Sequence, residues 1–313
     1  KKIIDRGSAE IITANHLYYY DASHPQPQMR NSMGVVPFTK KNCLLDPKNV
    51  LKSLYAFSRH GGAPRLHTAA MMFSQEVARR AISRIGSVIL TDMPNAMSLH
   101  PIILSSANSV YFADYPIVIV GRLGFSMSQN WALAARKRFA KEDFKLSLSP
   151  LTAYTRINST LENYLRVKKM LPKEFGDINI NYDQLAPIYL KELLYLDSDI
   201  KSAIKNWKNF FGFLKTLKPE TQKALLPSAK KMMMLAPFVY LARRSGLNYI
   251  KRFLYGFVKK TKNETASPRE KFAQGREFEI PLKNYSVNSI STLAHNLDEI
   301  FKKELGIKLD YRS

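Results

Sequence analysis

The stretch from Pro64 to Gln129 constrains the fold most, because short apolar runs and one amphipathic helix pattern converge there on an aspartate. Ser74 is a favourable N-cap for the predicted helix, and Gly86 is typical of a helix C-terminus. A further apolar run leads to Asp92, just before the predicted start of another helix. Strand and helix patterns that alternate in this way predict an α/β fold.

Four segments are predicted as strands, and one of them, residues 66–72, has mostly small side chains. Residues 9–20 are rich in β-branched and aromatic residues. Residues 110–112 and 117–120 are apolar runs separated by a polar stretch that contains Pro116, and we predict two short strands there. Together with the helices between them, these strands predict a mixed sheet with flanking helices.

The pattern changes near residue 150, where successive helical segments replace the alternating strands and helices. Ser159 and Glu162 match a capping box, which predicts a helix beginning at Ser159. Helical patterns then recur along the rest of the sequence. We therefore predict an α/β region over residues 1–149 and a mainly helical, basic region over residues 150–313.

The formal net charge of the sequence is +23. Such a balance favours polyanionic partners, namely nucleic acid, an anionic membrane surface or phosphorylated substrates, although a basic solvated surface also explains it. Cys43 is the single cysteine, which excludes a disulfide framework and suits a reducing compartment. No apolar run approaches the roughly 18 residues that a spanning helix needs. We expect a cytoplasmic protein that is able to contact the inner face of a membrane.

Asp92 is the first candidate for catalysis. A hydroxyl group is a weak nucleophile, so a reaction that transfers a group onto it needs a base that accepts the hydroxyl proton as the new bond forms. A carboxylate is ordinarily ionised at neutral pH and can serve as that base. Asp92 follows an apolar run and precedes a predicted helix, which places it where pockets form at a sheet edge. The same position favours a helix N-cap, and spacing alone leaves both interpretations open.

The order of motifs between residues 64 and 129 resembles the second half of family 2 glycosyltransferases. The matching sequence is P-R-L-H-T, a helix, I-G-S, T-D-M-P, a second helix, and then V-Y-F-A-D-Y-P-I-V-I-V-G-R. Residues 158–162 and 168–172 are similar to a helical tail of some bacterial members, so the resemblance spans about residues 8–200. The resemblance implies a GT-A fold, of which this chain would form a part, and sugar transfer with inversion from a nucleotide-sugar donor to a glycan or lipid-linked acceptor.

The resemblance also implies roles for several residues. It makes Asp92 the general base that deprotonates the acceptor. Apart from the resemblance, the guanidinium fork of Arg122 and the hydroxyl groups of Ser126 and Ser128 suit the donor diphosphate, although a basic solvent-exposed loop explains the same residues equally well. The residues assigned to the acceptor side are His67, Thr68 and Asn95, although a lone histidine such as His67 is more often a structural residue with satisfied hydrogen bonds.

Two features of the family are missing from the sequence. The nucleotide-binding strands and the metal-binding D-x-D motif precede the part that matches, so we expect a donor half before residue 1 and an inactive chain without it. The Mg²⁺ or Mn²⁺ of the complete enzyme would be held in that half, because these hard ions need oxygen ligands. Many members also have R-x-H after the last strand, where this chain has Arg122-Leu123-Gly124.

We predict no metal site within residues 1–313. The one D-x-D sequence, Asp197-Ser198-Asp199, is better explained as a polar junction between two helices. The histidines share no metal-ligand spacing with one another or with Cys43.

A different function also fits the charge. Residues 230–260 are basic and rich in aromatic side chains, and a helix of this kind can lie on an anionic membrane, although ordinary helix packing explains it as well. Residues 232–234, a run of three methionines, are interpreted as core filler. The alternative is therefore a non-catalytic basic protein that binds nucleic acid or an anionic membrane through its C-terminal helices. Nucleic acid is the less favoured partner, because no zinc finger or aromatic RNA-binding strand motif occurs.

Overall fold

The structure of the protein is a computed structural model, which describes residues 9–24, 29–58, 70–86, 96–122, 146–194, 200–244 and 266–309. The strands are β1 (Ile11–Tyr20), β2 (Ser32–Val35), β3 (Cys43–Leu45), β4 (Met71–Phe73), β5 (Val110–Arg122) and β6 (Phe278–Pro281). The helices are α2 (Pro47–Tyr55), α3 (Gln75–Ile85), α4 (Ala96–Ser105), α6 (Arg156–Met170), α7 (Pro172–Phe175), α8 (Tyr182–Leu194), α9 (Ile200–Leu214), α10 (Pro219–Arg244), α12 (Pro268–Ala273) and α13 (Ile290–Leu305).

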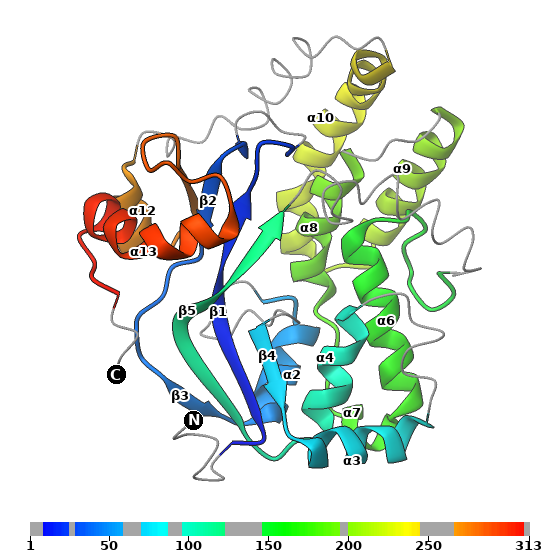
Figure 1. The fold of residues 1–313 in the computed structure, drawn as a ribbon. Helices are drawn as coiled ribbons and strands as arrows, with labels where there is room; N and C mark the ends of the chain where they lie inside the picture. Colours follow the sequence, from blue (N-terminus) through cyan, green and yellow to red (C-terminus); the bar gives the residue numbers. More distant parts are fainter. Residues whose placement is uncertain are drawn as a thin grey trace.

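These elements form a curled mixed sheet with helices on both sides, which confirms the predicted α/β class. Figure 1 shows α12 and α13 on one side of β1 and β5, and α2, α4 and α6 on the other. The strand order is β3-β5-β1-β2-β6, and β4 also pairs with β1. Strands β1 and β5 are parallel, whereas the other pairings are antiparallel. A parallel pair needs a long crossover between its strands, and here the crossover contains α2, α3 and α4.

The two short strands predicted over residues 110–120 are one continuous strand, β5, so this prediction was wrong. The pairing of β5 with β1 is irregular at its middle, because Ala14 pairs with Ala113 but Asn15 pairs with Pro116. The carboxylate of Asp114 accepts hydrogen bonds from the side chain of Asn15 and from the backbone N–H of Thr39, the latter at 2.7 Å. A bulge of this kind tolerates proline and keeps the strand intact on both sides of it.

Three apolar cores hold the fold together. The first lies between the sheet and α2, α4, α6 and α7 and includes Ile11 of β1. The second lies between the sheet and α13 and includes Leu17 and Tyr19, also of β1. The third joins α6, α8, α9 and α10. Strand β1 therefore contributes to two of the three cores.

Several helix boundaries agree with the sequence. The side chains of Asp46 and Ser74 cap α2 and α3 by accepting hydrogen bonds from the backbone N–H groups of Lys48 and Val77. Gly86 ends α3 with φ of 68°, a value that favours glycine. The region after residue 150 is mainly helical as predicted, but it also contributes β6, which pairs with β2 along its whole length.

The predicted capping box at Ser159 is wrong, because α6 begins earlier. Its N-cap is Thr155, whose hydroxyl accepts a hydrogen bond from the backbone N–H of Asn158 at 3.1 Å. Glu162 is fully buried inside the helix, and its carboxylate accepts hydrogen bonds from the backbone N–H groups of residues 147–149 at 2.8–3.2 Å. The guanidinium of Arg166 donates another at 2.9 Å. Glu162 thus fastens a loop to α6, a long-range role that the local pattern does not reveal.

Candidate functional site

The structure describes one of the predicted site residues, Arg122. The predicted residues that lie outside the described ranges are Asp92, His67, Thr68, Asn95, Ser126 and Ser128. Asp197 and Asp199 lie outside them as well. The geometry of the site therefore starts from Arg122 and its neighbours.

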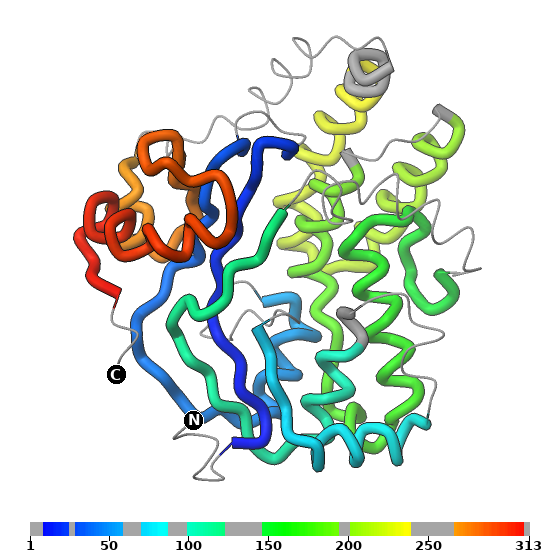
Figure 2. The backbone as a smooth tube through the Cα atoms, viewed as in Figure 1, coloured from blue at the N-terminus to red at the C-terminus, as the bar shows by residue number. Residues whose placement is uncertain are grey.

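Arg122 is the last residue of β5, at the edge of the sheet where the two parallel strands end. It pairs in register with Tyr20, the last residue of β1. The two strands can be followed to this edge in Figure 2. In α/β sheets, ligands commonly bind outside the carboxyl ends of the strands, so this edge is where a functional site is expected.

A row of four aromatic rings, His16, Tyr18, Tyr20 and His24, follows β1 to the same edge. Alternate residues of a strand share one face, which places the first three rings in line. Neighbouring ring centroids are 4.7 Å apart for His16 and Tyr18, 6.1 Å for Tyr18 and Tyr20, and 5.0 Å for Tyr20 and His24. We call these four residues the aromatic row.

Arg122 lies directly over the aromatic row. Its guanidinium carbon is 3.9 Å from the ring centroid of Tyr18 and 5.9 Å from that of Tyr20. A guanidinium that stacks through its face keeps its N–H donors, which lie in its plane, available for a further acceptor. Among the described residues, no carboxylate forms a salt bridge with Arg122. Burial raises the pKa of Tyr20 and the charge of Arg122 opposes this shift, so the phenol is neutral at physiological pH.

Strand β2 leaves room for the row at Gly34, which pairs with Tyr18. A Cβ atom at this position would lie 2.9 Å from a ring carbon of Tyr20 and 3.2 Å from the Cβ atom of Tyr18. Real Cβ contacts are not that short, so any larger residue would displace the Tyr20 ring. Gly34 is therefore needed for the close packing of the row against the sheet.

The turn after β1 brings His24 back to the row. The carboxylate of Asp21 accepts hydrogen bonds from the backbone N–H and the hydroxyl of Ser23, at 2.9 and 2.7 Å. The backbone N–H of His24 donates to the carbonyl of Asp21 at 3.2 Å, and its own carbonyl accepts from the guanidinium of Arg30 at 2.7 Å. These contacts fix the position of the buried His24 ring.

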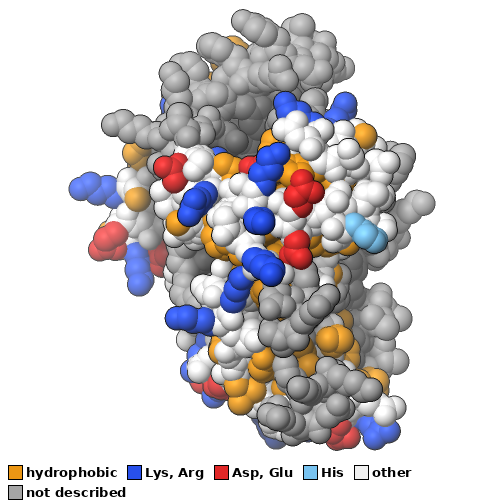
Figure 3. Space-filling view, turned by 60° about the vertical axis from the view of Figure 1, so that its left-hand side comes forward, with side chains coloured by type: hydrophobic (Ala, Val, Ile, Leu, Met, Phe, Trp, Pro, Cys, Tyr) orange, Lys and Arg blue, Asp and Glu red, His pale blue; other side chains and the backbone are white. Residues whose placement is uncertain are grey.

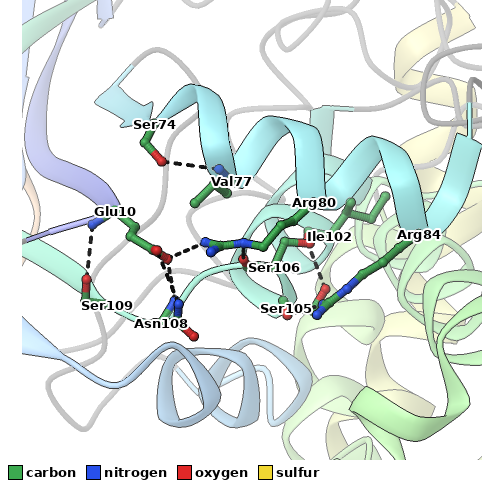
Figure 4. Close-up of polar contacts among 10 residues, drawn as sticks. All are labelled: Glu10, Ser74, Val77, Arg80, Arg84, Ile102, Ser105, Ser106, Asn108 and Ser109. Carbon is green, nitrogen blue, oxygen red and sulfur yellow. Dashed lines mark hydrogen bonds and ion pairs between the residues drawn. The ribbon is translucent and has the colours of Figure 1, made fainter.

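A second polar cluster joins α3 to the end of α4, the two helices on either side of the segment that contains Asp92 (Figure 4). The guanidinium of Arg80 donates to the carboxylate of Glu10 at 2.6 Å and to the carbonyl of Ser106 at 2.8 Å. Arg84 donates to the carbonyl of Ser105 at 2.6 Å. The two arginines satisfy carbonyls at the C-terminal end of α4, where positive charge is favourable. This cluster is structural: it holds together the helices that lead into and out of residues 87–95.

The described residues provide no ligand set for the Mg²⁺ or Mn²⁺ that the family resemblance implies. No group of three or more His, Cys, Asp or Glu side chains in them could hold a metal ion. Likewise, no helix in the described ranges combines the length and the apolar character needed to cross a bilayer. The described part of the site therefore offers the stacked guanidinium of Arg122, which suits an anion, beside the partly exposed ring of Tyr18. The other three rings of the aromatic row are buried.

The aromatic row was not predicted from the sequence, in which residues 9–20 were assigned only as a strand. The signal was present, because His16, Tyr18 and Tyr20 are spaced two apart and share one face of any strand. The position of Arg122 at the end of the neighbouring strand could not be inferred from that spacing, since it depends on the parallel pairing of β1 and β5.

Comparison of the chain with protein-family models, with curated protein sequences and with solved structures gives no match, so its function must be argued from its own residues.

Proposed function

We propose that the chain is the acceptor-side part of an inverting glycosyltransferase that uses a nucleotide-sugar donor. The observation that carries this proposal is the guanidinium of Arg122, stacked on Tyr18 at the carboxyl ends of β1 and β5. A nucleotide sugar combines a diphosphate with a sugar ring and a flat base. The guanidinium of Arg122 forms no salt bridge with a carboxylate among the described residues, so it suits the diphosphate. The partly exposed ring of Tyr18 beside it suits a flat face of the base or the sugar.

In the reaction that we propose, an acceptor hydroxyl attacks the anomeric carbon of the donor sugar. The new carbon–oxygen bond forms as the bond to the diphosphate oxygen breaks, which inverts the configuration. The carboxylate of Asp92 takes the proton from the acceptor hydroxyl, and the nucleoside diphosphate leaves with the bonding electrons. The positive charge of Arg122 stabilises the charge that develops on the leaving group. The divalent metal of the complete enzyme would supply further neutralisation of the diphosphate.

The test is the affinity of Arg122→Ala for nucleoside diphosphates, measured by calorimetry on the full-length protein with a panel of bases. Loss of a charge-assisted bidentate contact should weaken binding by about 10- to 100-fold. Arg122→Lys should recover part of the affinity, because it restores the charge but not the planar fork.

Arg79→Ala is the matched control, because Arg79 is an exposed arginine on α3 that forms an ion pair with Glu76. It should leave the affinity unchanged. If Arg122→Ala binds nucleoside diphosphates as tightly as the wild type, Arg122 does not hold the donor, and the proposed function loses its main support.

A further inference from the structure

The helical pair α9 and α10 is unusually basic. Residues 200–244 contain ten lysines and arginines and a single carboxylate, Glu220. The α12–α13 segment, residues 266–309, contains seven basic and six acidic residues, and Figure 3 shows blue and red side chains intermixed on that side of the molecule. Ten positive charges and one negative charge give residues 200–244 a net charge of +9, out of +23 for the whole sequence, and such a charge favours an anionic partner.

The two sides of α10 differ in what they contact. Leu225, Ala229, Met232 and Ala236, spaced three or four residues apart, pack into the third core. The residues on the opposite side of the helix are Lys223, Lys230, Met234 and Phe238, spaced by seven, four and four, and they are exposed. We call these four residues the outer face of α10. It combines two lysines with two large apolar side chains.

The apolar part of this face is not core filler. Met234 is 64% exposed and Phe238 is 59% exposed, whereas Met232 of the same methionine run packs against the core. The interpretation of the methionine run as core filler therefore holds for Met232 but is wrong for Met234. On α9, Ile204 is 51% exposed and lies next to the exposed Lys205. Large apolar groups thus lie among lysines on both helices.

We propose that the outer face of α10, with α9 beside it, binds the surface of an anionic lipid bilayer. Lysines attract the lipid headgroups, and apolar side chains between them enter the boundary between headgroups and acyl chains. Nucleic acid would also attract the lysines, but its backbone makes no use of exposed Met and Phe side chains on a helix. The inference concerns residues far in the sequence from Arg122, and it holds whether or not the protein transfers sugars.

The first experiment measures co-sedimentation of the full-length protein with vesicles of phosphatidylcholine alone or with about 30% phosphatidylserine, a probe of anionic surface charge. We expect binding to the anionic vesicles that weakens with salt, and little binding to the neutral ones. Lys223→Gln combined with Lys230→Gln should lower the partition coefficient by roughly 10-fold or more, since each lysine near such a surface contributes about fivefold. Met234→Ser combined with Phe238→Ser should lower it by a similar order.

Each double variant has a matched control. Lys302→Gln with Lys303→Gln removes the same charge from an exposed lysine pair on α13. Leu44→Ser with Met72→Ser removes two apolar side chains that are 61% and 56% exposed on β3 and β4. Both controls should bind vesicles as the wild type does. If they lose binding as strongly as the α10 variants, overall charge or overall apolar surface explains the binding, and the outer face of α10 has no special role.

The second experiment separates a membrane from other polyanions. In a Phe238→Trp variant, brominated lipids should quench the tryptophan fluorescence more than in a Met72→Trp variant, because only the first side chain would enter the bilayer. Equal quenching in both variants would overturn the proposal. So would tight, salt-sensitive binding to RNA that depends on Lys223 and Lys230 but not on Met234 and Phe238, combined with weak vesicle binding.

Discussion

Asp92→Asn should transfer sugar about 10²- to 10⁴-fold more slowly than the wild type, in the full-length protein with its natural donor and acceptor. The amide has nearly the shape of the carboxylate, but it cannot accept a proton at neutral pH. The acceptor hydroxyl would then attack while still protonated, which raises the barrier. The measurement is the turnover rate at saturating donor, together with the affinity for nucleoside diphosphate, which should change little because Asp92 does not contact the donor in our proposal.

Asp298→Asn is the control for this variant, because Asp298 is an exposed aspartate on α13, remote in sequence from the proposed site. It should transfer sugar at the wild-type rate. Circular dichroism should show that both variants fold like the wild type. A turnover rate for Asp92→Asn within about twofold of the wild type would show that another group is the base.

Glu162→Gln should lower the free energy of unfolding by about 2–4 kcal/mol. The carboxylate is fully buried and accepts hydrogen bonds from three consecutive backbone N–H groups and from Arg166. A glutamine keeps one acceptor oxygen, but its amide group would face donors, and the ion pair between Arg166 and Glu162 would be lost. Glu299→Gln, at an exposed position of α13, should change the stability by less than about 0.5 kcal/mol.

The effect of Glu162→Gln should depend on pH with a definite sign. Burial pushes the pKa of Glu162 upwards, but the hydrogen bonds from Arg166 and from the backbone of residues 147–149 outweigh it, so the pKa is lowered. Such a group stabilises the fold fully above its unfolded pKa of about 4.3, and this stabilisation is lost as the pH falls through the lower folded value. Urea unfolding should therefore show the largest gap between wild type and variant at neutral pH. A gap that grows on acidification would contradict this account of Glu162.

The parts of the fold that were predicted correctly are those with local causes. Ser74 and Gly86 act on backbone groups within a few residues of themselves, so their positions in the sequence are sufficient to place both ends of α3. The errors have long-range causes. Pro116 looked like the end of a strand because the Asp114 bulge that accommodates it depends on Asn15 and Thr39. Strand β6 was missed because four residues show no pattern of their own and are ordered by pairing with β2.

Less of the candidate site than of the fold could be predicted, because its contacts join residues that are far apart in the sequence. Arg122 was named because its guanidinium suits a diphosphate, and the structure adds its contact with Tyr18. That contact joins residues about a hundred positions apart through the parallel pairing of β1 and β5, which no local pattern encodes. Conversely, the outer face of α10 could be located only once the core-facing residues were known, because its sequence alone does not say which methionine is buried.

Strand β1 has a consequence for the cooperativity of the whole fold. It supplies Ile11 to the core beneath α2 and α4, and Leu17 and Tyr19 to the core beneath α13. Pulling β1 out of the sheet would open both cores at once, so neither can melt as an independent foldon. Its partner β5 follows it in the sequence only after a long segment that contains several helices and strands. Bringing β1 and β5 together costs chain entropy, and this cost must be met before either core is complete. The aromatic row therefore lies on β1, the strand that must be ordered before the α/β region can reach its native state.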